Sequence, residues 1–358
     1  IALTGVGRVD EANARFREAI RIDPAFHPAL KELGINEFKK GRLKEALGSL
    51  LQVIKLGHAD ETTHLCVAEV YFAQQDMRAA IPHFEKSRNL LIRQPVSILR
   101  FAMSLLDQGE PEKAAAVLDQ LPANDAMSRF EAGMALGRSG AHVEAARFFA
   151  SARKTYPDPL AAGYNQVLML VTAREYDQAL VAGQELLNEG QKSAALLSLI
   201  ARAYMETGRL EQAVAALREA AGLDPVAIEN YVALAMICLE RGNDDLGIEI
   251  IDVGLHHRPD SPVLHLHRGV LMAAKGDTNE AEKGFETARA LAPDSPMPYT
   301  ALGIIWMQTG KPEKAVEVLR DAARRNRNDH VISYTFSLAL IRSGIDPMSP
   351  EAREAVNA

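Results

Sequence analysis

The sequence is poor in the residue types that usually build disulfide frameworks, cofactor sites and aromatic cores. Its 358 residues include two cysteines and one tryptophan, and aromatic residues make up 6% of the chain. Two cysteines do not decide between a reducing and an oxidising compartment. No apolar run approaches the length that a helix needs to span a bilayer. We therefore expect no direct insertion of this chain into a membrane.

Charge of one sign and recognisable catalytic motifs are also scarce. The net charge of −7 is mild, whereas a general nucleic-acid binder normally shows a basic stripe. There is no glycine-rich phosphate loop, no His-Glu-x-x-His, no Cys-x-x-Cys and no nucleophile elbow. The local histidine clusters, His256-His257 and His265-x-His267, point in different directions on a helix and make no ready metal site. These absences predict a non-enzyme that uses no cofactor or metal and does not bind nucleic acid.

Small residues, in contrast, recur at a fixed interval through almost the whole chain. We call these positions the repeat markers: Ala12, Ala46, Ala80, Ala114, Ala145, Ala179, Ala213, Gly247, Ala281 and Ala315. Eight of the nine intervals between markers are 34 residues, and one, from Ala114 to Ala145, is 31. A fixed period of this size predicts a solenoid of helical units, in which each unit contacts only its neighbours.

Four further positions keep the phase of the markers. Five residues before the marker most repeats have glycine, which suits a left-handed turn, and Gln75 and Arg174 are the exceptions. Twelve residues before the marker lies another small residue, and four residues after it lies a large apolar one. Twelve residues after the marker, proline ends several repeats. Each repeat is thus predicted to be a first helix, a tight turn and a second helix that crosses closely.

Two copies show the full pattern best: Tyr299…Leu302-Gly303…Trp306…Ala315…Leu319…Ala322 and Leu197…Ile200-Ala201…Tyr204…Ala213…Leu217…Ala220…Pro225. This pattern resembles the tetratricopeptide repeat family. The resemblance covers residues 1–344 with about ten repeats. It implies an all-α fold, an α-solenoid of antiparallel helix pairs stacked into a right-handed superhelix with a concave face.

Two places within residues 1–344, which are expected to form a single solenoid, depart from the pattern. The 31-residue interval predicts an irregular junction near residues 121–128. The repeat over residues 160–190 is divergent, with Val167, Arg174 and Gly183 at the positions of the small residue, the turn glycine and the large residue. We expect the superhelix to change pitch or flex within residues 121–190. A looser junction is also expected at residues 89–95.

The two ends of the chain carry separate expectations. The chain starts at Ile1, within what should be a first helix, which suggests a fragment or a processed protein. The pattern stops after Gly344, and Ser349-Pro350-Glu351 is typical of a helix start. Residues 345–358 are therefore expected to form a C-terminal capping segment with a short helix at 350–357. Cys66 and Cys238 lie about five repeats apart, which makes an intramolecular disulfide geometrically implausible.

The resemblance also indicates where a ligand would bind. In the family, ligands usually contact first-helix positions fifteen and eleven residues before the marker, which share one helical face. Fifteen of the twenty residues at these positions are apolar or tyrosine, and an exposed apolar strip predicts a binding groove. The predicted groove comprises Leu99, Met103, Phe130, Met134, Tyr164, Leu168, Ser198, Arg202, Val232, Met236, Leu266 and Val270. The alternative is that these residues form the core between neighbouring first helices, and each interpretation can hold at different repeats.

These observations predict a non-catalytic scaffold that binds a peptide or helix of a partner protein in its concave groove. One alternative is the recognition arm of a larger multidomain enzyme, or of an envelope polysaccharide or secretion assembly. Another is self-association through the truncated N-terminal repeat. The residues of the chaperone-tail clamp do not occur at the matching positions, and only Asn165 matches the asparagine ladder of the O-linked sugar transferases, so both specialisations are disfavoured. Alanine, glycine and arginine usage suggests a bacterial protein, and the sequence leaves its compartment, cytoplasm or periplasm, open.

Overall fold

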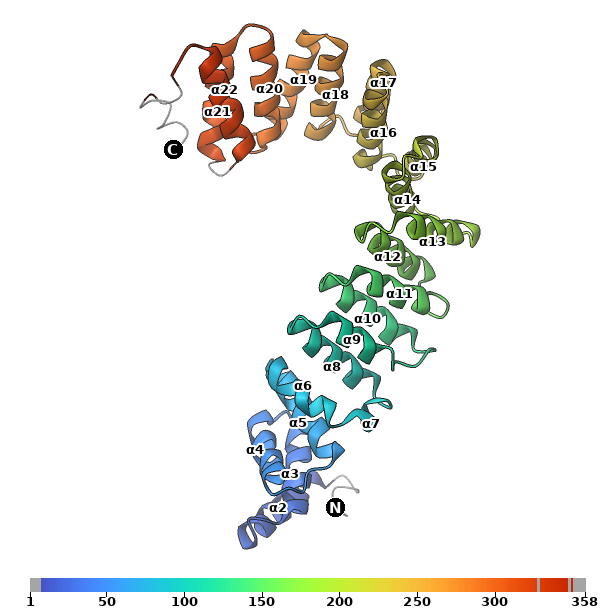
Figure 1. Cartoon of the computed structure of the whole chain (residues 1–358), viewed down its shortest axis with the longest axis vertical. Helices are drawn as coiled ribbons and strands as arrows, with labels where there is room; N and C mark the ends of the chain where they lie inside the picture. Colours follow the sequence, from blue (N-terminus) through green and yellow to red (C-terminus); the bar gives the residue numbers. More distant parts are fainter. Residues whose placement is uncertain (1–7, 327–328, 347–348, 350–358) are drawn as a thin grey trace. The chain divides into compact units, whose positions relative to one another are not determined.

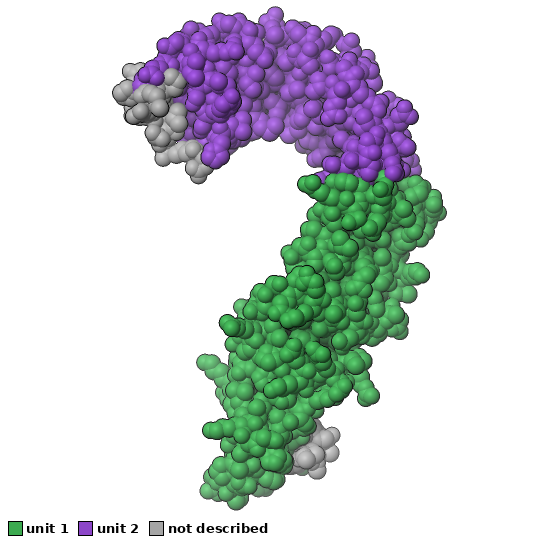
Figure 2. All heavy atoms as spheres, viewed as in Figure 1, with its two compact units in different colours: residues 1–191 green, residues 192–358 purple. Residues whose placement is uncertain are grey.

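The computed structural model describes residues 8–326, 329–346 and 349, and all regular secondary structure within them is α-helical (Figure 1). The chain divides into two compact units, residues 1–191 and 192–358 (Figure 2). Across the described ranges, no helix combines the length and the hydropathy that a bilayer crossing requires. The expected turn at Gly7, the helix stub before it and the expected helix at 350–357 lie outside the described residues.

The helices of each unit follow the predicted order of first and second helices. Unit 1 contains α2 (Val9–Ile22), α3 (His27–Lys39), α4 (Leu43–Lys55), α5 (Glu61–Ala73), α6 (Met77–Glu85), α7 (Arg88–Leu91), α8 (Pro95–Asp107), α9 (Pro111–Leu118), α10 (Ala126–Arg138), α11 (His142–Arg153), α12 (Pro159–Thr172) and α13 (Tyr176–Asn188). Unit 2 contains α14 (Ala194–Glu206), α15 (Leu210–Leu223), α16 (Ile228–Glu240), α17 (Asp244–His257), α18 (Pro262–Lys275), α19 (Thr278–Leu291), α20 (Pro296–Gln308), α21 (Pro312–Arg325) and α22 (His330–Arg342). The α-solenoid of paired helices is therefore confirmed.

Each first helix from α3 to α20 packs on the second helix that follows it, and each second helix packs on the next first helix within its unit. The first helices are α3, α5, α8, α10, α12, α14, α16, α18, α20 and α22. First helices of neighbouring repeats also touch, for example α18 with α20 and α20 with α22. This contact between first helices matters for function, because it decides which of their side chains stay on the surface.

The turns inside the repeats have the backbone conformation that the sequence predicts. Seven described glycines five residues before a marker have positive φ, among them Gly208 at 73° and Gly276 at 89°. Gln75 and Arg174, the two exceptions in sequence, adopt the same conformation with φ of 63° each. A side chain with a Cβ atom is strained there, and backbone hydrogen bonds close both turns, from Asp76 N–H to the Tyr71 carbonyl and from Glu175 N–H to the Leu170 carbonyl (2.9 Å each).

The small residue twelve positions before the marker gives room to the large residue four positions after it. A Cβ atom on Gly303 would lie 2.5 Å from Leu319 Cδ1, and one on Gly269 would lie 2.5 Å from Phe285 Cε1. In the divergent repeat, over residues 160–190, a different glycine makes room for a large side chain. There Gly163 provides the close approach, and its Cβ would lie 2.3 Å from Leu186 Cδ2.

Irregularities occur where the sequence lacks the usual signals. The short interval between Ala114 and Ala145 contains α9, which has 8 residues where α11 has 12. The junction expected at residues 89–95 contains α7, a helix of 4 residues. At the starts of two first helices, Ser261 accepts from the backbone N–H of Leu264 (3.3 Å), whereas Ser295 makes no side-chain cap bond.

The apolar cores lie between the helices of each unit and consist mainly of small and aliphatic side chains. In unit 1, Phe84, Leu105 and Leu136 belong to one cluster that runs from α5 to α11. In unit 2, Phe285, Leu319 and Phe336 belong to a cluster that runs from α18 to α22. Each such side chain contributes about 2 kcal/mol when it leaves water, so the stack is stable without one central core.

Candidate functional site

Unit 2 has an apolar pocket on its first helices. Its lining includes six large apolar side chains: Met236 of α16, Leu266 and Val270 of α18, Met297 and Ile304 of α20, and Val331 of α22. The pocket has a volume of about 370 Å³. Met297, Ile304 and Val331 are 57%, 43% and 62% exposed, which is unusual for large apolar side chains. A surface of this kind is typical of a binding site.

The position of these residues in the repeat explains why they meet. They lie 18, 15 or 11 residues before a marker, and in α22 the same positions are counted from residue 349. Residues three and four apart share one side of a helix, so these three positions form one stripe. We call this stripe the first-helix face. Over α18, α20 and α22 it carries no charged residue, and its members are Val263, Leu266, Val270, Met297, Thr300, Ile304, Val331, Tyr334 and Leu338.

Three polar side chains also line the pocket. After its described hydrogen bonds, each still has an acceptor atom that a ligand could use. Thr300 donates its hydroxyl proton to the carbonyl of Pro296 (3.1 Å). His267 Nδ1 lies 2.8 Å from the carbonyl of Val263, and because a carbonyl only accepts, Nδ1 carries the proton. Asp329 accepts from the N–H groups of Val331 and Ile332 with one carboxylate oxygen.

In unit 1, the predicted groove residues divide between core and surface. Leu99 is buried in the core cluster, and the Phe130 ring stacks on Tyr156 with 4.3 Å between ring centroids. Met103 and Met134, four residues further along the same helices, are 42% and 36% exposed. The position fifteen before the marker therefore packs between repeats there, while the position eleven before it faces outward.

Five residues of the predicted groove line no described pocket: Tyr164, Leu168, Ser198, Arg202 and Val232. Tyr164 and Leu168 of α12 are half-buried. The Ser198 hydroxyl lies 2.6 Å from Asn230 Oδ1 and joins α14 to α16. Arg202 is exposed on α14, and Val232 packs against the core beside Tyr231.

The structure brings Met236, Leu266 and Val270 together, and it adds residues that the predicted groove did not include. Thr300 and Ile304 belong to the apolar strip but were not singled out from it. Met297 and Val331 lie 18 residues before the marker, a position that the prediction did not use. They lie three residues before the position fifteen before the marker and so share its side of the helix. This spacing could have identified them from the sequence.

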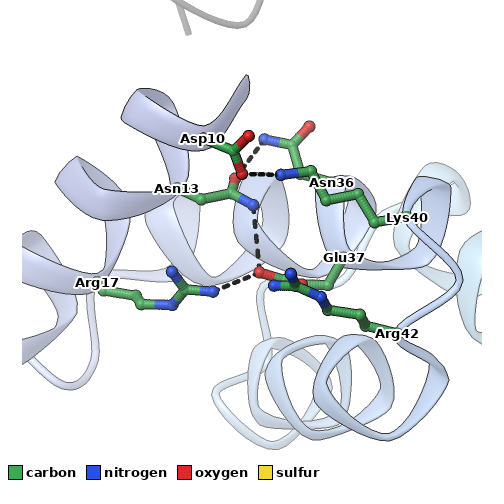
Figure 3. A network of polar contacts seen from close by, with 7 residues as sticks. All are labelled: Asp10, Asn13, Arg17, Asn36, Glu37, Lys40 and Arg42. Atoms are coloured by element: carbon green, nitrogen blue, oxygen red, sulfur yellow. Dashed lines mark hydrogen bonds and ion pairs between the residues drawn. The ribbon is translucent and has the colours of Figure 1, made fainter. Parts of the chain in front are cut away.

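The first helices α3 and α5 of unit 1 carry polar networks, whereas Met103 and Leu106 of α8 and Ala135 of α10 line a smaller pocket of about 230 Å³. Figure 3 shows one of these networks, around the buried Glu37 of α3. The Glu37 carboxylate accepts from Arg17 (2.5 Å) and Asn13 (3.2 Å) of α2 and from Arg42 (3.1 Å). Asn36 donates to Asn13 Oδ1 at 2.8 Å, so both buried asparagines are bonded. The network joins two neighbouring repeats through fully satisfied polar groups.

One repeat further along unit 1, a second buried carboxylate also joins two neighbouring repeats. Glu69 of α5 accepts from the Ser97 hydroxyl (2.6 Å) and pairs with Arg100, both on α8. Sequence patterns did not reveal either network, because the contacts that join neighbouring repeats link residues 20 or more positions apart and follow no local motif.

Histidines also meet in unit 1, although no described group of three or more His, Cys, Asp or Glu residues could hold a metal ion. His64 of α5 and His83 of α6 have their Nδ1 atoms 3.0 Å apart, so one ring donates to the other. Burial, then the neighbouring His64 and Lys86, lower the pKa of His83 to about 4. This pair is therefore neutral at pH 7 and belongs to the packing of α5 on α6.

Paired helices, left-handed turns at a fixed interval and an open first-helix face define a helical-repeat protein. Sequence profiles described as tetratricopeptide repeat match residues 170–226, 272–333 and 99–159, which together make up about half of the chain. The chain belongs to the tetratricopeptide repeat family, and its fold is one that supports protein–protein interaction. No curated protein matches the chain by sequence.

Solved structures resemble the chain at low sequence identity. A tetratricopeptide repeat protein from Parabacteroides merdae is 15% identical with a TM-score of 0.47, over 65% of this chain and 97% of that chain. Yeast Tom70 is 11% identical with a TM-score of 0.48, over 92% and 94%. PilW, a type IV pilus biogenesis factor, is 16% identical with a TM-score of 0.46, over 55% and 98%. The family assignment rests on the sequence profiles.

Proposed function

We propose that this protein is a non-catalytic scaffold that binds a segment of a partner protein on the first-helix face of unit 2. The pocket between Met236 and Val331 is the observation that carries the proposal. It spans four successive first helices, which lie roughly 10 Å apart in such packing, so a bound segment has a track of about 30 Å. A helix of about 20 residues or an extended segment of about 9 residues fits that length.

The energetics favour a partner over an empty surface. Met297, Ile304 and Val331 are largely in water in the free chain, and covering each contributes about 1 kcal/mol or more. Binding must also offset the cost of ordering the partner segment, so a few such side chains give moderate affinity. Moderate affinity is what a scaffold with exchangeable partners requires.

The proposal is tested by selecting random 16-residue peptides on the whole chain and measuring their affinity by fluorescence anisotropy. Two variants place a charge at the same repeat position in different units: Ile304→Glu in the pocket and Met134→Glu in unit 1. Both parent side chains are partly exposed, so both variants should fold, which circular dichroism checks.

We expect Ile304→Glu to weaken the selected peptides at least about tenfold, because a buried charge in the interface is costly. Met134→Glu should change their affinity by less than about twofold. If Met134→Glu had the larger effect, the groove predicted in unit 1 would be the site. If neither variant changed the affinity, partners would bind elsewhere and the proposal would be wrong.

A further inference from the structure

The pocket in unit 2 offers acceptors to a ligand and very few donors. The hydroxyl proton of Thr300 is used by Pro296, and the Nδ1 proton of His267 is used by Val263. Thr300 Oγ1 and His267 Nε2 therefore have lone pairs to offer. Only one oxygen of Asp329 is used in capping α22, and the other makes no described hydrogen bond. All three polar side chains of the pocket thus call for a donor on the ligand.

The charged residues around the pocket also favour a ligand that carries hydrogen-bond donors. Asp329 is the one charged side chain among its described lining residues. On α16, Glu229 and Glu240 lie seven residues before and four residues after Met236, on the same side of the helix. Both are exposed and make no ion pair among the described residues.

The cations of this face lie further away. Arg202 is on α14 and does not line the pocket. Arg342, at the end of α22, donates to the carbonyl of Met307 (3.5 Å). The apolar pocket is thus bordered by carboxylates that no described cation neutralises.

We propose that the partner segment is basic and aliphatic, with lysine or arginine next to its apolar residues. This inference rests on the function proposed above and names the chemistry of the partner. The methylene stem of a lysine or arginine packs on Met297 and Val331, and its charged end reaches Asp329. A leucine or isoleucine beside it fills the space between Leu266, Val270 and Ile304. Backbone or side-chain N–H groups of the segment donate to Thr300 and His267.

Two synthetic 16-residue peptides test this inference on the whole chain. Both carry leucines at positions 5, 9 and 12 in an alanine background, and they differ only in four flanking residues, which are lysine in one and glutamate in the other. Fluorescence anisotropy gives their dissociation constants at low salt and at high salt. We expect the lysine peptide to bind at least about tenfold more tightly at low salt, and the difference to shrink at high salt because the charges are screened.

Asp329→Asn gives a matched variant, because asparagine caps a helix as well as aspartate does but carries no charge. We expect it to reduce the preference for the lysine peptide about threefold while α22 stays folded. Glu229→Gln should act in the same direction. Arg15→Gln, an exposed change on α2, should leave the preference unchanged.

Each outcome separates this inference from the function on which it rests. Equal binding of the two peptides, or tighter binding of the glutamate peptide, overturns the inference. If both peptides bind the parent chain equally and both lose binding to Ile304→Glu, the pocket remains the binding site and only the proposed charge preference is wrong. If neither peptide binds and randomly selected peptides ignore Ile304→Glu, both proposals fall.

Discussion

Charged residues on the first helices are used differently in the two units. In unit 1, Lys31 of α3 pairs with Asp60 (2.5 Å), Glu37 is held by two arginines, and Glu69 pairs with Arg100. In unit 2, the face over α18, α20 and α22 has no charged residue, and the acids beside it on α16 have no described partner. One repeat framework thus supports two kinds of surface.

The comparison shows how a solenoid can separate stability from recognition. A buried carboxylate that is fully hydrogen-bonded fixes which residues of neighbouring helices meet, although it adds little net stability. An exposed apolar pocket adds nothing to the free chain but favours a partner. Glu37 of α3 and Glu69 of α5 are committed to packing in unit 1, whereas the acids beside the pocket of unit 2 make no described ion pair.

The largest effect on this comparison is expected from Glu37→Ala in unit 1. The variant removes a buried acceptor from Asn13, Arg17 and Arg42, and we expect unit 1 to lose about 3 kcal/mol of unfolding free energy. The two arginines are half-exposed and can turn to water, which keeps the loss below that of a fully enclosed pair. Urea unfolding combined with amide exchange of α2–α4 measures it.

Glu206→Ala in α14 is the matched control for this variant. Glu206 is exposed and makes no ion pair among the described residues, so its loss should cost less than about 0.5 kcal/mol. Equal losses for the two variants would contradict the claim that unit 1 commits its charges to packing.

A smaller effect is expected from pH, again in unit 1. Burial and neighbouring cations lower the pKa of His83 to about 4, and that of His64 is also lowered, chiefly by burial. An unfolded histidine titrates near 6.5, so as the pH falls the unfolded chain takes up protons first. The stability that the pair provides is therefore complete above about pH 6.5 and is lost between about 6.5 and 4.

Going from pH 7.5 to 5.0 should cost unit 1 about 1 kcal/mol, a figure reduced for the partial exposure of the rings. Amide exchange of α5 and α6 measures this loss, with α14 and α15, which contain no histidine, as the internal reference. His83→Gln should remove most of the pH response. An unchanged response in that variant would assign it to other groups.

The smallest effect is expected at the two turns that lack glycine, both of which lie in unit 1. Gln75→Gly and Arg174→Gly relieve a positive φ of 63°, and each should stabilise the chain by about 0.5 kcal/mol. Gly242→Ala in unit 2, where φ is 68°, should destabilise by a similar amount. Thermal unfolding of the three variants checks the signs, and a loss in Gln75→Gly would show that its side chain stabilises the turn.

The sequence predicted the fold well because its signals are local. Glycine positions placed the turns, and even Gln75 and Arg174 kept the conformation that the phase required. Short helices such as α7 were missed because nothing in the period encodes them. The candidate site was only partly predicted. A first-helix residue can be part of the core, like Leu99, or line the pocket, like Ile304. Which of the two it is depends on how the next first helix packs against it, and the sequence of a single repeat does not reveal that packing.

Methionines at equivalent positions allow the most direct test of the claim that unit 2 carries the binding surface. Met103 and Met134 lie eleven residues before their markers in unit 1, as Met236 does in unit 2, and Met127 and Met297 form a second matched set. We would label the methionine methyl groups with ¹³C and titrate the whole chain with the lysine peptide by NMR. The account predicts that the signals of Met236 and Met297 shift while those of Met103, Met127 and Met134 stay in place. Shifts confined to the unit 1 methionines would contradict it.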